Sequence, residues 1–125
     1  MGYLKHHARL AEEKHDGAIR EFEEKRFTNV ADLSLKCIEQ LVEAAASADG
    51  LHFHLKPRTA HAERNRWAKE RFPEISQDLD ILWSVCGDLG YDGLNGERAA
   101  EAIHSMEEII RAVQDRTGIK LEEAD

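Results

Sequence analysis

The feature that most constrains the fold is a stretch between residues 30 and 46 in which apolar side chains recur every three or four positions. It carries two apolar rows: Val30, Leu33, Cys37, Leu41 and Ala44 form one, and Ala31, Leu35, Ile38, Val42 and Ala45 form the other. This spacing is that of an α-helix, and so wide an apolar surface must be covered on several sides. We therefore predict a central helix that starts at a cap at Thr28 or Asn29 and ends at Asp49-Gly50.

Further helices are predicted on either side of this one, because apolar residues keep the same three- and four-residue steps. Their expected ranges are 3–25, 59–71, 75–89 and, after a cap at Asn95, a last helix closed by Gly118. No segment alternates between apolar and polar residues, so no strand is expected. The predicted fold class is all-α, an up-and-down bundle of four to five helices in which residues 1–125 form a single domain.

Composition indicates in which part of the cell such a bundle is expected. No apolar run approaches the roughly 18 residues of a membrane span, and the first residues lack the apolar core of a secretory signal. A cytoplasmic protein without membrane contact is therefore expected. Cys37 and Cys86 both lie on apolar helix faces, which favours two buried thiols over a disulfide or a metal site.

The charge of the chain is unevenly distributed. The formal net charge is −8, which argues against a protein that coats nucleic acid indiscriminately. Between Lys56 and Arg71, however, six lysines and arginines face only two glutamates, a local net charge of +4. We call residues 56–71 the basic segment and predict that it is the functional face of the protein.

Within the basic segment, a helical wheel places Arg64 and Arg71 on one arc with Trp67, and His61 at its edge. An arginine on an apolar face needs an opposite charge, either an internal carboxylate or an anionic ligand. The internal candidates are Asp78, Asp80 and Glu39. The ligand alternative is a phosphate-binding cleft with Trp67 as a stacking face. Its predicted residues are Arg58, His61, Arg64, Trp67 and Arg71.

Histidines suggest a metal-binding alternative. His52, His54 and His61 lie near one another in sequence, and imidazole is a good ligand for zinc, but no fourth donor follows them. Glu12 with His15, and Glu101 with His104, also place a carboxylate and an imidazole one helical turn apart. Chance spacing explains such pairs, so solvated or hydrogen-bonded histidines are favoured, and no cofactor is expected.

Three stretches carry a family resemblance: "KRFTNVADLSLKCIEQLVEAAA", "HLKPRTAHAERNRWAKERFPEI" and "LGYDGLNGERAAEAIHSMEEII". Over roughly residues 10–115 the chain resembles small archaeal and bacterial members of the HEPN superfamily. The resemblance implies a bundle of four or five helices, a homodimer, and association with nucleotides or RNA. It also implies a nucleotidyltransferase-like protein partner, as in toxin–antitoxin pairs. A homodimer is predicted independently, because the apolar surface of the central helix with Ile109, Ile110 and Val113 exceeds what one bundle would cover.

Active members of this superfamily are ribonucleases with an arginine followed four to six residues later by a histidine. Arg98 and His104 match this spacing and are the candidate catalytic pair. Arg9 and His15 have the same spacing, but in both pairs an apolar residue follows the arginine. Enzyme activity is therefore left open. The predicted function is an accessory or binding module for nucleotides or RNA, and the alternatives are a homodimeric scaffold without a ligand or a metal-binding bundle.

Overall fold

The computed structural model describes residues 2–84 and 95–121, and every regular element in these ranges is a helix. The predicted all-α bundle is therefore confirmed. The elements are α1 (Gly2–Glu23), α2 (Phe27–Ala48), the short 3₁₀ helix η1 (Phe53–Leu55), α3 (Ala60–Arg71), the 3₁₀ helix η2 (Pro73–Ile75), α4 (Ser76–Ser84) and α5 (Gly96–Thr117). None of the described helices is long and apolar enough to cross a membrane.

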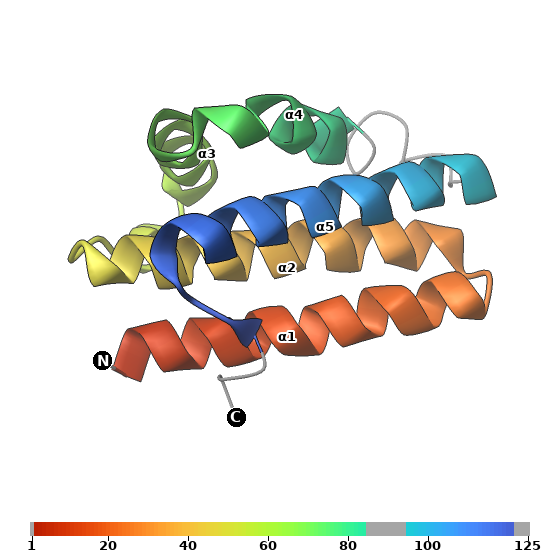
Figure 1. Cartoon of the computed structure of the whole chain (residues 1–125), viewed down its shortest axis with the longest axis horizontal. Helices are drawn as coiled ribbons and strands as arrows, with labels where there is room; N and C mark the ends of the chain where they lie inside the picture. The colour runs from red at the N-terminus through yellow and green to blue at the C-terminus, as the bar shows by residue number, and fades with distance from the viewer. Residues whose placement is uncertain (1, 85–94, 122–125) are drawn as a thin grey trace.

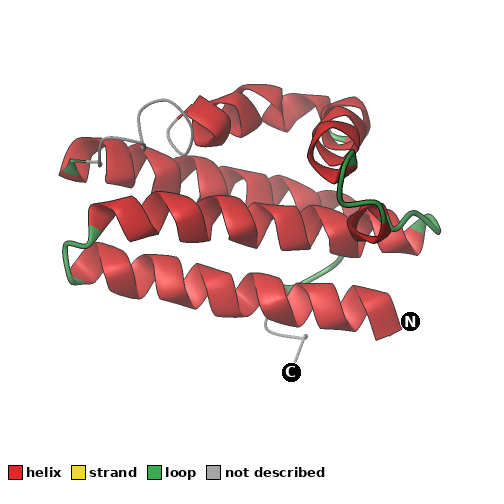
Figure 2. Cartoon of the chain, turned by 180° about the vertical axis from the view of Figure 1, so that it is seen from behind, coloured by secondary structure: helices red, strands yellow, loops and turns green. Residues whose placement is uncertain are grey.

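Three long helices lie along the molecule, and the two shorter ones lie to one side of them (Figure 1). α1 and α2 form an antiparallel pair, and α5 packs against α2 on one side and α4 on the other. α3 runs across the others, so that Figure 2 shows it almost end-on next to α2. This crossing brings the basic segment over the C-terminal half of α2, which is where the candidate site lies.

The helix ends follow the predicted signals closely. Asn95 caps α5, since its side-chain oxygen accepts a hydrogen bond of 2.8 Å from the backbone N–H of Arg98. Gly50 and Gly118 follow α2 and α5 with positive φ angles of 78° and 77°, a conformation that glycine adopts without strain. The predicted cap of α2 is wrong: the helix starts at Phe27 after Arg26, so Thr28 and Asn29 lie inside its first turn. The predicted end of the fourth helix at residue 89, and Cys86, lie outside the described residues.

α2 forms the centre of the core, as its two apolar rows predict. Most of the side chains in both rows are buried, and so is the Cys37 thiol, whose pKa is raised by burial. One basis for the homodimer prediction is wrong, however. Ile109, Ile110 and Val113 are buried inside a single chain, because α5 packs directly on α2. They leave no surplus apolar surface.

α3 differs from the other helices in how little it buries. Only Ala60 and Ala68 of its twelve residues are buried, and its composition is strongly polar. Phe72, the residue that ends it before Pro73, is completely buried and anchors its C-terminal end. Trp67 is half-buried against the core, and Arg64 adds ion pairs with Glu39 and Glu43 on α2.

Candidate functional site

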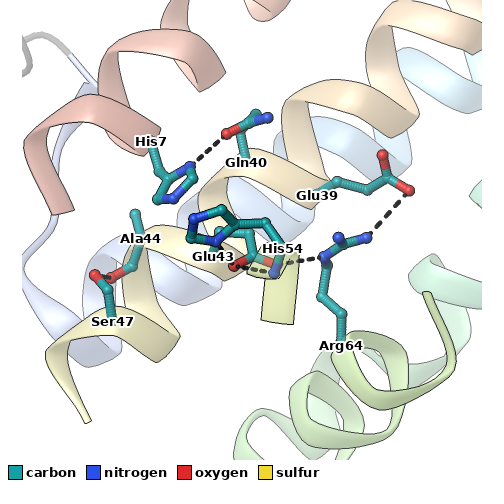
Figure 3. A network of polar contacts seen from close by, with 8 residues as sticks. All are labelled: His7, Glu39, Gln40, Glu43, Ala44, Ser47, His54 and Arg64. Atoms are coloured by element: carbon teal, nitrogen blue, oxygen red, sulfur yellow. Dashed lines mark hydrogen bonds and ion pairs between the residues drawn. The ribbon is translucent and has the colours of Figure 1, made fainter. Parts of the chain in front are cut away.

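The candidate site is built around Glu43, a carboxylate in the middle of the apolar surface of α2. Its side chain is 2% exposed. Oε1 accepts hydrogen bonds from His54 Nδ1 at 3.0 Å and from the His54 backbone N–H at 3.3 Å. Oε2 accepts one from Nε of Arg64 at 3.0 Å (Figure 3). Both oxygens of this buried acid are therefore satisfied by side chains that come from outside α2.

A second carboxylate lies one helical turn earlier, at Glu39. Its Oε2 is 3.4 Å from a terminal guanidinium nitrogen of Arg64 and 2.9 Å from Nδ1 of His61, both at ion-pair distance. Arg64 thus lies between two acids, and its side chain is only 13% exposed. Glu39, Glu43 and Arg64 together carry a net charge of −1. His61 lies at the Glu39 end of this group, and His54 lies at the Glu43 end.

α1 contributes a third histidine to this region. His7 is buried, and its Nδ1 lies 2.7 Å from the side-chain oxygen of Gln40, so the imidazole donates this hydrogen bond. Its ring meets that of His54 edge to face, with centroids 4.6 Å apart (Figure 3). Three separate elements, α1, α2 and η1, therefore bring polar groups to one point.

The protonation of these groups follows from burial and from their partners. Burial alone would raise the pKa of Glu43, but hydrogen bonds from His54 and Arg64 outweigh it and hold that pKa below its ordinary value. Burial is the main cause that lowers the pKa of His7, although the bond to Gln40 opposes it and the nearby His54 adds to it. The site therefore favours an ionised Glu43 and a neutral His7.

A small cavity opens beside Arg64, between α2, α3 and α4. Its lining includes Glu39, His61, Arg64, Asn65 and Trp83. Its volume is about 20 Å³, which is room for about one water molecule. A nucleotide does not fit in this cavity.

The structure brings together only some of the five predicted phosphate-binding residues. His61 and Arg64 meet at Glu39, one of the acids predicted as an internal partner. Arg71 is exposed, with its guanidinium carbon 5.2 Å from the centre of the Phe72 ring, and Arg58 is exposed as well. Trp67, the expected stacking face, is half-buried and packs between Phe53 and Phe72.

The ring beside His61 is instead that of Trp83, 4.9 Å away between centroids. A helical wheel gives the direction in which Trp67 leaves α3, but it cannot show that Phe53 and Phe72 occupy that side.

The predicted metal ligands His52, His54 and His61 do not converge as a set. His54 contacts Glu43, whereas His61 contacts Glu39. The rings of His52 and His54 are neighbours, with centroids 6.1 Å apart. Among the described residues, the group whose potential ligand atoms do converge is His7, Glu43 and His54.

The other sequence candidates lie on α1 and α5. Arg98 pairs with Glu101 at 3.4 Å, and His104 is exposed further along the same helix. Residues six positions apart point in directions about 120° apart around a helix, so the side chains of Arg98 and His104 diverge. His15 lies 2.6 Å from Glu107, which gives this half-buried histidine a carboxylate partner.

Sequence reasoning missed His7, Gln40 and Glu43. A signal for Glu43 was present, since it interrupts the run "LVEAAA" between residues of the two buried rows. An acid at such a position must be paired. His7 had no comparable signal, because its partners lie on other elements.

Comparisons with protein-family models, curated proteins and solved structures find no match to this chain. The HEPN resemblance therefore stays a prediction.

Proposed function

We propose that the protein is an accessory module that binds nucleotides or RNA through the exposed cations of the basic segment. One observation carries this proposal. Lys56, Arg58, Arg66 and Arg71 are all exposed, and none of them pairs with an acid among residues 2–84 and 95–121. Arg64 and Lys69, by contrast, are neutralised by Glu39, Glu43 and Asp80.

The two groups of cations have different roles in this proposal. Arg64 holds α3 on α2 and is not available to a ligand, so phosphate binding falls to Arg58 and Arg71, with Lys56 and Arg66 nearby in sequence. Unpaired arginines can hold a phosphate through two parallel hydrogen bonds. The acidic remainder of the chain would repel a polyanion and confine it to this segment.

The proposal is tested by fluorescence anisotropy with a short single-stranded RNA over a series of salt concentrations. Affinity should fall as salt rises, because binding to phosphates releases counterions. Arg58→Ala with Arg71→Ala should weaken binding and reduce the slope of log affinity against log salt by about 1 for each phosphate that the variant no longer binds. Arg111→Ala is the matched control, since Arg111 is exposed on α5 and pairs locally with Glu108. Absence of binding at low salt would favour a scaffold without a ligand.

A homodimer and a nucleotidyltransferase-like protein partner belong to the same proposal, and the protein partner follows from the resemblance alone. Exposed apolar residues offer one place for a dimer contact, because Leu51 and Leu55 are 38% and 61% exposed beside the basic segment. Sedimentation equilibrium tests this point. We expect a dimer that Leu55→Glu weakens, whereas a monomer at micromolar concentration would contradict it.

A further inference from the structure

We propose that His7, Glu43 and His54 form a binding site for one divalent first-row transition-metal ion, with Zn²⁺ as the reference case. One nitrogen from each imidazole and one oxygen of Glu43 all lie within 4.8 Å of one another. These residues come from α1, α2 and η1, so a bound ion would tie together three elements. Two imidazoles and one carboxylate are the donor set of many zinc and iron sites.

The distances between the three ligand atoms need only modest adjustment to fit a metal ion. Two ligand atoms of a tetrahedral ion with bonds of about 2.05 Å lie about 3.4 Å apart. His54 Nδ1 and Glu43 Oε1 are already 3.0 Å apart, so the ion would replace the hydrogen that they share. The ligand nitrogen of His7 lies within 4.8 Å of the other two ligand atoms, so it has to approach by at most about 1.4 Å, which a rotation of its side chain can supply. Binding would release the shared proton to solvent.

Gln40 fixes the orientation that His7 needs. Because the side-chain oxygen of Gln40 accepts from Nδ1–H of His7 at 2.7 Å, the lone pair of the neutral imidazole is on Nε2. Metal-bound histidines are commonly oriented in this way by an acceptor on the other ring nitrogen.

The charge of the surroundings also suits a cation. Glu39, Glu43 and Arg64 carry a net charge of −1, and Arg64 binds Oε2 of Glu43 while Oε1 is directed to His54. Arg64 can therefore hold the carboxylate in place while its other oxygen coordinates the ion. The His54 side chain is 31% exposed, which gives the ion a path from solvent. Water would complete the coordination.

This site shares only His54 with the loop histidines that the sequence suggested, and it does not depend on the proposed binding of RNA. Nitrogen donors favour Zn²⁺, Co²⁺, Ni²⁺ or Fe²⁺ over Mg²⁺ and Ca²⁺, which prefer oxygen.

The experiment uses the untagged full chain, treated with a chelator and dialysed, and titrates it with Co²⁺ while visible absorption is recorded. We expect a d–d absorption band that saturates at one equivalent per chain and that Zn²⁺ abolishes by displacement. His7→Gln and His54→Gln should each remove saturable binding. Gln40→Leu should weaken it by about 10- to 100-fold, because Gln40 only positions His7.

The control is His104→Gln, since this histidine is exposed on α5 and lies outside the predicted ligand set. Circular dichroism checks that every variant is folded. If a ligand variant does not fold, the parent chain still gives a decision: Zn²⁺ should raise its melting temperature by several degrees and release protons. A parent chain without saturable absorption, or binding that survives His7→Gln or disappears in His104→Gln, would overturn the proposal.

Discussion

Arg64 on α3 donates a hydrogen bond through Nε to Oε2 of Glu43 on α2, across 3.0 Å and almost shielded from water. The pair joins the most polar helix of the protein to the centre of its core. A buried acid that is paired costs the folded state little free energy, whereas the same acid without its partner costs several kcal/mol. The free energy of unfolding of variants at Arg64 and Glu43 therefore measures how strongly this pair holds α3 on α2.

Arg64→Ala should lower the free energy of unfolding by about 3–5 kcal/mol, because it leaves Glu43 charged and buried with only His54 as a hydrogen-bonding side chain. Urea denaturation measures this change. Arg111→Ala, which removes an exposed arginine, should stay within about 0.5 kcal/mol of the parent. The double variant Arg64→Met with Glu43→Leu should recover much of the stability, since the buried Glu43 charge is removed with its partner, and Glu39 keeps His61 at 2.9 Å. A small effect of Arg64→Ala alone would show that solvent reaches Glu43.

Stability should decrease as the pH falls below about 6.5, the ordinary pKa of histidine. The pKa of His7 is lowered in the folded state, so the unfolded chain binds more protons in this range and is favoured by acid. Burial is the main cause of this lowered pKa; the neighbouring His54 and His6 add to it, whereas Gln40 and Glu43 oppose it. Urea denaturation from pH 7.5 to pH 5 with a chelator present should show the decrease, and His7→Gln should reduce it. An equal pH dependence in His7→Gln would rule out His7 as the cause.

Asn95→Ala should destabilise the protein by about 1 kcal/mol, because it removes the 2.8 Å hydrogen bond that caps the first turn of α5. Asn95→Asp should retain most of the stability, since aspartate accepts the same bond and carries a favourable charge at a helix N-terminus. Thermal melts of the three proteins, compared at one pH, test this. If Asn95→Asp were as unstable as Asn95→Ala, the hydrogen bond would not be the source of the stabilisation.

Cys37 should resist thiol reagents until the protein unfolds. It is completely buried in α2, and burial raises the pKa of its thiol, so the reactive thiolate is scarce. A Cys86→Ser variant leaves Cys37 as the single thiol for a reaction with Ellman's reagent. We expect slow labelling in buffer and rapid labelling in concentrated urea. Rapid labelling in buffer would mean that α2 is accessible in the folded state.

The helices could be predicted from the sequence because their signals are local. Apolar spacing identifies α2, an asparagine caps α5, and glycines end both, all within a few residues of each helix. The candidate site could not be predicted in the same way. Its hydrogen bonds join residues 11, 21 and 33 positions apart, so they depend on how α1, η1 and α3 are placed around α2.

The positions of the two tryptophans show the same limit. The wheel placed Trp67 correctly on the inner side of α3, where it is half-buried, yet its neighbours are Phe53 and Phe72. Trp83, from another helix, takes the position next to His61 that Trp67 was expected to occupy.

The sparse apolar packing of α3 has a consequence for local unfolding of the protein. Only two alanines of this helix are buried, and besides the half-buried Trp67 its attachment to α2 includes the ion pairs of Arg64 with Glu39 and Glu43. Elements held in this way separate from a protein at a lower free energy than its core, through local openings that leave the rest folded. α3 would then be a detachable cover over Glu39 and Glu43, and its backbone amides would exchange with solvent deuterium well before those of α2. Acid or high salt, by weakening the ion pairs, would open this cover first.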